Sequence, residues 1–255
     1  MPLDAPWAAS AFVAFGVLVG AYGTLVGAGG GFLVVPALIL ACGFDPKLAV
    51  GTSLAVVLCN AMSGTWAYAR RGLVEWRTAL VFAAATVPGS LLGPHLLAMV
   101  PERAFKAAFG LLLLGLAAWL LFKPAPPADA GGARRGLFWG AVLSLGVGFL
   151  SSMLGIGGGV IHVPVLIYLL GFPAHVAIAT SHATLAVSAG FGVAAHAREG
   201  QVLWGTALPI GLGALVGAQA GAWLSRRVAM PWVIRALGAA IALVGVRCLW
   251  MAFSG

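Results

Sequence analysis

Eight apolar runs, each close to the length that crosses a lipid bilayer, dominate the amino-acid sequence. They occupy residues 8–26, 48–69, 78–98, 104–122, 137–154, 175–196, 204–224 and 232–253. A membrane helix needs about 20 apolar residues. Because 62% of the 255 residues are hydrophobic and only 8% are charged, the chain departs strongly from the composition of a soluble protein. The sequence therefore predicts an all-α polytopic membrane protein whose surroundings are the lipid bilayer.

The net charge of +8 comes from 14 Lys and Arg residues against six acids. The basic residues cluster in short loops, such as Arg70-Arg71 and Arg226-Arg227. This is typical of loops held on the cytoplasmic side of a membrane, so nucleic-acid binding is not expected. Cys42, Cys59 and Cys248 lie inside apolar runs at no metal-ligand spacing. Neither a disulfide framework nor a metal site nor a cofactor is predicted.

The sequence repeats itself at an offset of 128 residues. The stretch VGAGGGFLVVPAL (26–38) aligns without a gap on LGIGGGVIHVPVL (154–166). Between residues 27–76 and 155–204, 22 of 50 positions are identical, which chance similarity of Ala-rich helices does not readily produce. Repeats of this kind are typical of secondary transporters. We predict two homologous halves joined by a polar, Pro/Gly-rich linker: residues 8–122, 123–136 and 137–253.

Each half contains a GxGGG segment followed five positions later by a proline, Pro36 or Pro164. A nucleotide-binding loop is excluded because no strand precedes the glycines and no Walker lysine follows them. Close helix packing is the alternative explanation. It accounts well for Gly16 with Gly20, but less well for three consecutive glycines, which form helices poorly, ahead of a proline that removes a backbone donor.

We therefore interpret each GxGGG segment as a break in a membrane helix. The short runs that follow, 32–42 and 160–170, span only about 17 Å each at 1.5 Å per residue. The prediction is about eight full spans and two short broken segments. The first amide groups after each break carry partial positive charge and would suit an anion near the bilayer midplane.

The distribution of acids supports an anionic substrate. All six acids lie in termini or loops: Asp4, Asp45, Glu75, Glu102, Asp129 and Glu199. Carriers of cations usually place a carboxylate inside the membrane. Glycine amides together with hydroxyl and amide side chains would serve a small oxyanion instead. The predicted substrate-binding residues are Gly27, Gly29, Gly30, Gly31, Thr52, Ser53, Asn60, Gly155, Gly157, Gly158, Gly159, Thr180, Ser181 and Ser188.

Two histidines distinguish the second half from the first. His162 and His182 occupy the positions where the first half has Val34 and Leu54. They are candidates for proton coupling or substrate contact, and the alternative is that both are hydrogen-bonded packing residues. The remaining histidines, His95, His175 and His196, are expected at the membrane interface.

An intramembrane hydrolase that uses Ser181 or Ser188 with a histidine is a further alternative. Nothing in the sequence resembles a nucleophile elbow, so no catalytic residue is predicted. A rival from another class is a non-transporting membrane scaffold or subunit, in which the glycines only pack helices.

The paired GxGGG-x4-P segments, each followed by Gly-Phe and Thr-Ser, resemble the sulfite exporter TauE/SafE family, also called the toluene-sulfonate uptake permease family. The resemblance covers residues 10–250. It implies a bacterial inner-membrane transporter, expected to export a small sulfur-containing or organic anion such as sulfite, sulfoacetate or a sulfonate. The family motif falls on the glycines and prolines named above, and its second signature falls on Thr52-Ser53 and Thr180-Ser181.

The orientation of the two halves depends on the number of crossings in each. With inverted repeats, Lys and Arg divide nine to five between the two sides of the membrane, whereas parallel repeats with re-entrant short segments divide them seven to seven. The positive-inside rule therefore favours inverted repeats. The common description of the family as four duplicated helices favours parallel ones. A homodimer is compatible with the sequence.

Overall fold

The computed structural model describes residues 8–122, 136–225, 227–228 and 230–253. The predicted linker lies outside these residues apart from Gly136. The described chain is all-helical and contains no strand, which confirms the predicted class. Its ten helices are α1 (Ala8–Val26), α2 (Gly31–Cys42), α3 (Pro46–Ala69), α4 (Trp76–Met99), α5 (Glu102–Phe122), α6 (Leu137–Leu154), α7 (Gly159–Tyr168), α8 (Ala174–Arg198), α9 (Trp204–Leu224) and α10 (Met230–Phe253).

Six of the described helices are long and apolar enough to cross a membrane: α1, α3, α4, α6, α8 and α9. Helices α2 and α7, with 12 and 10 residues, are the predicted short segments. Helices α5 and α10 have 21 and 24 residues and lie where two further spans are predicted. The total of eight full spans stays a prediction.

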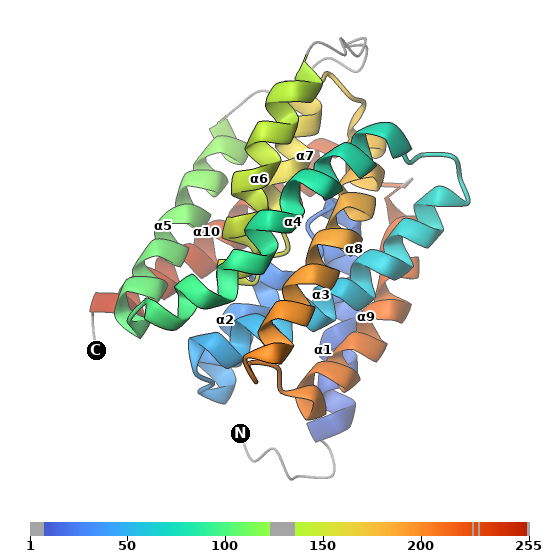
Figure 1. Ribbon diagram of the computed structural model, residues 1–255. Coiled ribbons are helices and arrows are strands. Elements are labelled where there is room, and N and C mark those ends of the chain that lie inside the picture. The colour runs from blue at the N-terminus through green and yellow to red at the C-terminus, as the bar shows by residue number, and fades with distance from the viewer. Residues whose placement is uncertain (1–7, 123–135, 226, 229, 254–255) are drawn as a thin grey trace.

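Helices α1 and α2 form a hairpin that enters the molecule from one end, and α6 and α7 form a second hairpin that enters from the other. In Figure 1, α1 begins at the lower end and α2 returns toward it, whereas α6 begins at the upper end and α7 returns there. Helices α3 and α8 pack together between the hairpins and run in opposite directions. The tips of the two hairpins therefore lie in the interior.

The first five helices interlock with the last five. Helix α1 packs on α9, α6 packs on α4, and α5 packs on α10. Glycines make these contacts close: a Cβ added to Gly217 would collide with the backbone oxygen of Val17, and one added to Gly20 would collide with the backbone of Ala214. Small residues allow such close approach between membrane helices, so the packing interpretation of Gly20 is confirmed.

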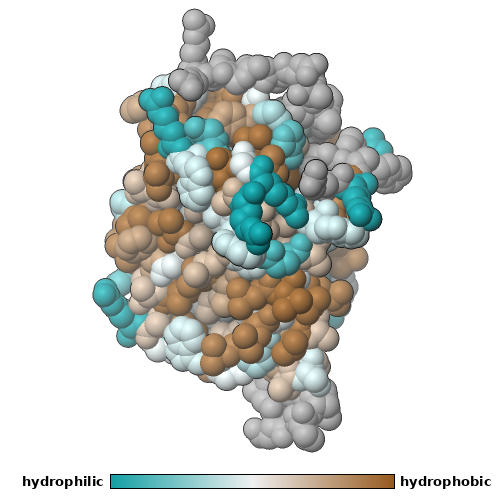
Figure 2. All heavy atoms as spheres, turned by 90° about the vertical axis from the view of Figure 1, so that its right-hand side faces the viewer, coloured by the Kyte–Doolittle hydropathy of each residue, from teal (hydrophilic) through white to brown (hydrophobic). Residues whose placement is uncertain are grey.

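Large apolar side chains face outward on many of the described helices. Leu18, Leu80, Leu212 and Val216 are each more than half exposed. Figure 2 shows a broad apolar surface on one side of the molecule, with hydrophilic groups gathered mainly toward the upper part of the view. An apolar surface of this extent suits contact with lipid.

Candidate functional site

The two glycine breaks meet in the interior of the molecule. Residues 27–31 and 155–159 are all buried. A Cβ added to Gly31 would collide with the carbonyl oxygen of Gly155, and one added to Gly159 would collide with the carbonyl oxygen of Gly27. The contact is reciprocal: Gly159 is the counterpart of Gly31 at the offset of 128 residues, and Gly155 is the counterpart of Gly27. The structure thus brings together two segments that lie far apart in the sequence.

Each break ends one helix and begins another, as the glycine pattern predicts. Gly30 and Gly158 are the N-caps of α2 and α7, with φ angles of 82° and 68°. These left-handed angles favour glycine over residues with a Cβ. A glycine N-cap has no side chain to accept a hydrogen bond from the first amides of the helix. The amides of Leu33, Gly159 and Ile161 donate to nearby backbone carbonyls, whereas those of Gly31, Phe32 and Val160 have no acceptor among the described residues. Pro36 and Pro164 are buried inside the short helices.

The predicted Thr-Ser pairs hold the breaks in place. Ser53 Oγ donates to the carbonyl oxygen of Gly155 at 2.9 Å, and Ser181 Oγ donates to that of Gly27 at 3.2 Å. Both bonds cross from one half to the other. The serine hydroxyl hydrogens are therefore engaged by the breaks themselves in this conformation.

The neighbouring threonines tie the same two helices to the loops that precede α9 and α4. Thr52 Oγ1 accepts from the amide of Leu203 at 3.0 Å, and Thr180 Oγ1 accepts from the amide of Glu75 at 3.1 Å. Leu203 and Glu75 are again 128 positions apart, so this contact also has a counterpart in each half.

Asn60 and Ser188, at matching positions, differ in their surroundings. Asn60 Nδ2 donates to the carbonyl oxygen of Gly20 at 3.1 Å, and its Oδ1 accepts from Thr24 Oγ1 at 2.7 Å. Ser188 Oγ is buried and has no hydrogen-bond partner among the described residues. Asn60 is therefore part of a closed network, whereas Ser188 keeps a free hydroxyl.

The two predicted histidines are buried, each with one unpartnered nitrogen. His162 Nε2 lies 3.2 Å from Ser144 Oγ, whose own hydrogen goes to the carbonyl oxygen of Gly140. His182 Nδ1 lies 3.3 Å from the carbonyl oxygen of Ile178. These nitrogens must donate, so His162 Nδ1 and His182 Nε2 are lone-pair acceptors without a partner in the described structure.

His182 belongs to a polar cluster between α1, α3 and α8. Its ring fits against Gly64, where a Cβ would lie 3.0 Å from Nε2, and its centroid is 5.7 Å from that of Tyr68. Tyr68 donates to the carbonyl oxygen of Thr24 at 3.0 Å. The ring of His162 instead lies 5.7 Å from Phe82. The structure thus places the two histidines in separate environments.

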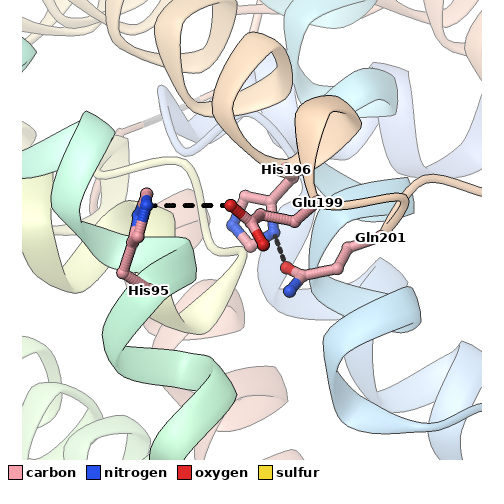
Figure 3. Close-up of polar contacts among 4 residues, drawn as sticks. All are labelled: His95, His196, Glu199 and Gln201. Atoms are coloured by element: carbon pink, nitrogen blue, oxygen red, sulfur yellow. Dashed lines mark hydrogen bonds and ion pairs between the residues drawn. The ribbon is translucent and has the colours of Figure 1, made fainter.

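His196, in the last turn of α8, is fully buried within the protein, and its predicted position at the membrane interface stays a prediction. Its Nε2 donates to the carbonyl oxygen of Ser152 at 2.9 Å, and its Nδ1 lies 2.7 Å from the side-chain oxygen of Gln201. Figure 3 shows this pair beside the surface pair of His95 and Glu199. The alignment of His196 with Tyr68 was the signal for burial, because the two make the same contact in their respective halves.

Apolar side chains complete the surroundings of the breaks. Val57 and Leu185 are fully buried. A Cβ added to Gly157 would lie 2.6 Å from Val57 Cγ1 and 3.1 Å from Leu185 Cδ1. Nothing in the sequence pattern singles out either residue. Within the described residues, no group of three potential metal-binding side chains occurs.

Comparison with known proteins gives a family match over most of the chain. Residues 12–248 match the family described as sulfite exporter TauE/SafE. The probable membrane transporter protein YunE of Bacillus subtilis is 28% identical over 263 residues, covering 93% of this chain and 96% of the relative. A probable membrane transporter protein of Xylella fastidiosa (strain Temecula1) is 31% identical over 248 residues, covering 94% of each chain.

The similarity extends to other bacteria. The probable membrane transporter protein YfcA of Escherichia coli is 29% identical over 202 residues, covering 78% of this chain and 74% of the relative. No solved structure matches the chain significantly. Together with the six apolar spans, the matches identify a multi-pass protein of the cell inner (cytoplasmic) membrane, and the chain belongs to the sulfite exporter TauE/SafE family of membrane transporters.

Proposed function

We propose that the protein is a secondary carrier that exports a small sulfur-containing or organic anion, such as sulfite, sulfoacetate or a sulfonate, across the bacterial inner membrane. The observation that carries the proposal is the buried meeting of the two breaks, where the first amides of α2 and α7 lack side-chain caps. Helix N-termini of this kind attract anions. We assign no catalytic role: Ser181 Oγ donates to the carbonyl oxygen of Gly27, a use that does not suit a nucleophile.

We further propose that the two halves are inverted repeats. The reciprocal contacts of Ser53 with Gly155 and Ser181 with Gly27 support this, as do the two hairpins that enter from opposite ends (Figure 1). In this proposal α1 and α2 return together to the side from which they enter, so α3, α4 and α5 are the crossings of the first half and the total is six in place of the eight predicted from the sequence. An odd number of crossings in each half reverses the second half relative to the first. The nine-to-five division of basic residues then assigns the end with the 70–75 loop to the cytoplasm.

The proposed substrate is compact and is held modestly. The side chains found around the breaks are hydroxyls, an amide and aliphatic groups, and each helix N-terminus contributes about 0.3–1 kcal/mol when exposed and up to ~2 when partly buried. Two such termini with hydroxyl donors correspond to affinities in the micromolar to millimolar range. We expect a preference for sulfite or a short sulfonate over a bulky, multiply charged anion such as citrate, which would call for arginine.

We propose that His162 and His182 take part in proton coupling or in substrate contact. Each offers an unpartnered acceptor nitrogen in the interior. A proton that accompanies the anion would reside on one of these nitrogens or on the anion itself. His182, beside Tyr68 and the Thr24–Asn60 pair, has the more polar surroundings.

Counterflow in liposomes tests the proposal. Purified protein in vesicles preloaded with sulfite should accumulate labelled sulfite with saturable kinetics, more readily than sulfate or citrate. Gly159→Ala should abolish this flux, because the new methyl group would strike the backbone of the first break. Gly146→Ala is the matched control, since a Cβ at Gly146 meets nothing within 4 Å. Non-saturable flux would indicate a channel, and absence of flux for every anion tested would favour the scaffold.

A further inference from the structure

Val57 and Leu185 occupy corresponding positions on the two central helices. Val57 lies one helical turn after Ser53 on α3, and Leu185 lies one turn after Ser181 on α8. Residues four apart share a helix face. On each of the two helices, one face therefore carries both the serine that bonds to a break and the aliphatic side chain that packs against a break.

Each of the two side chains contacts both breaks. A Cβ added to Gly29 would collide with Leu185 Cδ2 and lie 3.1 Å from Val57 Cγ1. At Gly157 the corresponding distances are 3.1 Å to Leu185 Cδ1 and 2.6 Å to Val57 Cγ1. The aliphatic pair thus lies at the centre of the molecule, against glycine backbone on both sides.

The pair belongs to a small apolar cluster with Ala61 and Ala189, one turn further along α3 and α8. At these two positions the side chain is only the methyl group of alanine. The bulk of the cluster is therefore concentrated at the level of the breaks. Apolar constrictions of this kind exclude water and ions from a membrane pathway.

We propose that Val57 and Leu185 form the gate of the carrier, and that their size determines which anions reach the break amides. The inference rests on the proposed transport function. In the conformation described here, both side chains are fully buried against the breaks. An anion reaches the amides only after they move aside, so a bulkier anion requires a larger displacement of α3 against α8.

Truncating the gate should relax selectivity for size. We would measure the ratio of kcat/KM for a longer alkanesulfonate to that for sulfite in liposomes. Leu185→Ala should raise this ratio at least about threefold, and Val57→Ala, which removes less side chain, should raise it less. The control is Leu54→Ala, which truncates a buried side chain of the same helix pair that lies against Gly192 and not against a break.

The outcomes are distinguishable. A wild-type protein that transports no anion would overturn the proposed function and the gate with it. Wild-type transport combined with the same selectivity in Leu185→Ala as in Leu54→Ala would overturn the gate alone.

Thiol labelling provides a second readout if the truncated variants fold poorly. In a background where Cys42, Cys59 and Cys248 are replaced by alanine, Leu185→Cys should react with a small sulfonate-bearing thiol reagent faster during turnover than at rest. Leu54→Cys should show no such acceleration. Equal rates at rest and during turnover for Leu185→Cys, in protein that transports, would contradict a gate that moves.

Discussion

The first and second predicted halves use the same contacts to hold the breaks but different side chains a short distance away. Ser53 and Ser181 each donate to a break carbonyl in the opposite half. In the last turn of α3 and of α8, Tyr68 and His196 donate to the backbone oxygens of matching residues, yet one is a phenol and the other an imidazole. The two halves thus hold the breaks with the same hydrogen bonds, but they differ in the titratable side chains that they bury.

The position of His182 shows the difference most clearly. His182 fits against Gly64 on α3, and its counterpart Leu54 fits against Gly192 on α8. The same steric contact is made once by an imidazole and once by an aliphatic side chain. An imidazole is therefore not needed to fill this space, since Leu54 fills its counterpart.

The largest expected effect tests whether both halves depend on close helix contacts. Gly217→Leu on α9 and Gly89→Leu on α4 should each destabilise the protein by about 3 kcal/mol or more, because their new side chains would meet the backbones of α1 and α6. Gly146→Leu, which points into open space on α6, should change the midpoint of thermal unfolding little. Loss of stability in only one of the two buried variants would break the equivalence of the halves.

The next effect compares the two serine bonds. Ser53→Ala and Ser181→Ala should each lower the free energy of unfolding by about 1–2 kcal/mol, since each leaves a buried carbonyl without its donor. We expect the two values to agree closely and both variants to lose transport. Ser63→Ala removes a hydroxyl that bonds to Leu215 away from the breaks and serves as the control. A transport defect in one serine variant but not the other would assign the substrate to a single break.

The third prediction compares the two halves at the positions of His162 and His182. Replacing His162 with Val and His182 with Leu gives the second half the residues of the first. We expect stability to change by less than about 1.5 kcal/mol, and the pH dependence of sulfonate transport to flatten, because the two side chains proposed to carry a proton with the anion are gone. A sulfonate keeps its charge over the pH range of such a measurement. An unchanged profile would remove both residues from the mechanism.

The smallest effect concerns an exposed histidine–glutamate pair. His95 and Glu199 approach to 3.7 Å with side chains 68% and 42% exposed (Figure 3). Exposed ion pairs contribute little. His95→Ala should therefore shift the free energy of unfolding by less than about 0.5 kcal/mol and leave anion flux unchanged. A clear loss of flux would mean that this surface takes part in transport.

The breaks could be predicted from the sequence because three glycines and a proline disfavour a continuous helix wherever they occur. Helices α1 and α6 end at Val26 and Leu154, beside the first glycine of each motif. The repeat suggests that the two breaks lie near each other, but it does not predict their contacts. The hydrogen bonds of Ser53 and Ser181 to the breaks depend on how α3 and α8 are placed in space.

Val57 and Leu185 could not have been found in this way. In a chain rich in aliphatic residues, a gate residue has the same hydropathy as a lipid-facing one, and only its contacts distinguish it. Gln201, which bonds to His196, was missed because the residue lies in a loop whose path along α8 the sequence does not specify.

The position of a bound anion tests the central claim most directly. Selenite has the charge and shape of sulfite and scatters anomalously at the selenium edge, so crystals grown with it would locate the anion without ambiguity. We predict one peak between residues 27–31 and 155–159, within hydrogen-bond distance of the first amides of α2 or α7, with Val57 and Leu185 displaced. A peak at the basic loops around Arg70 or Arg227, with none at the breaks, would contradict the account.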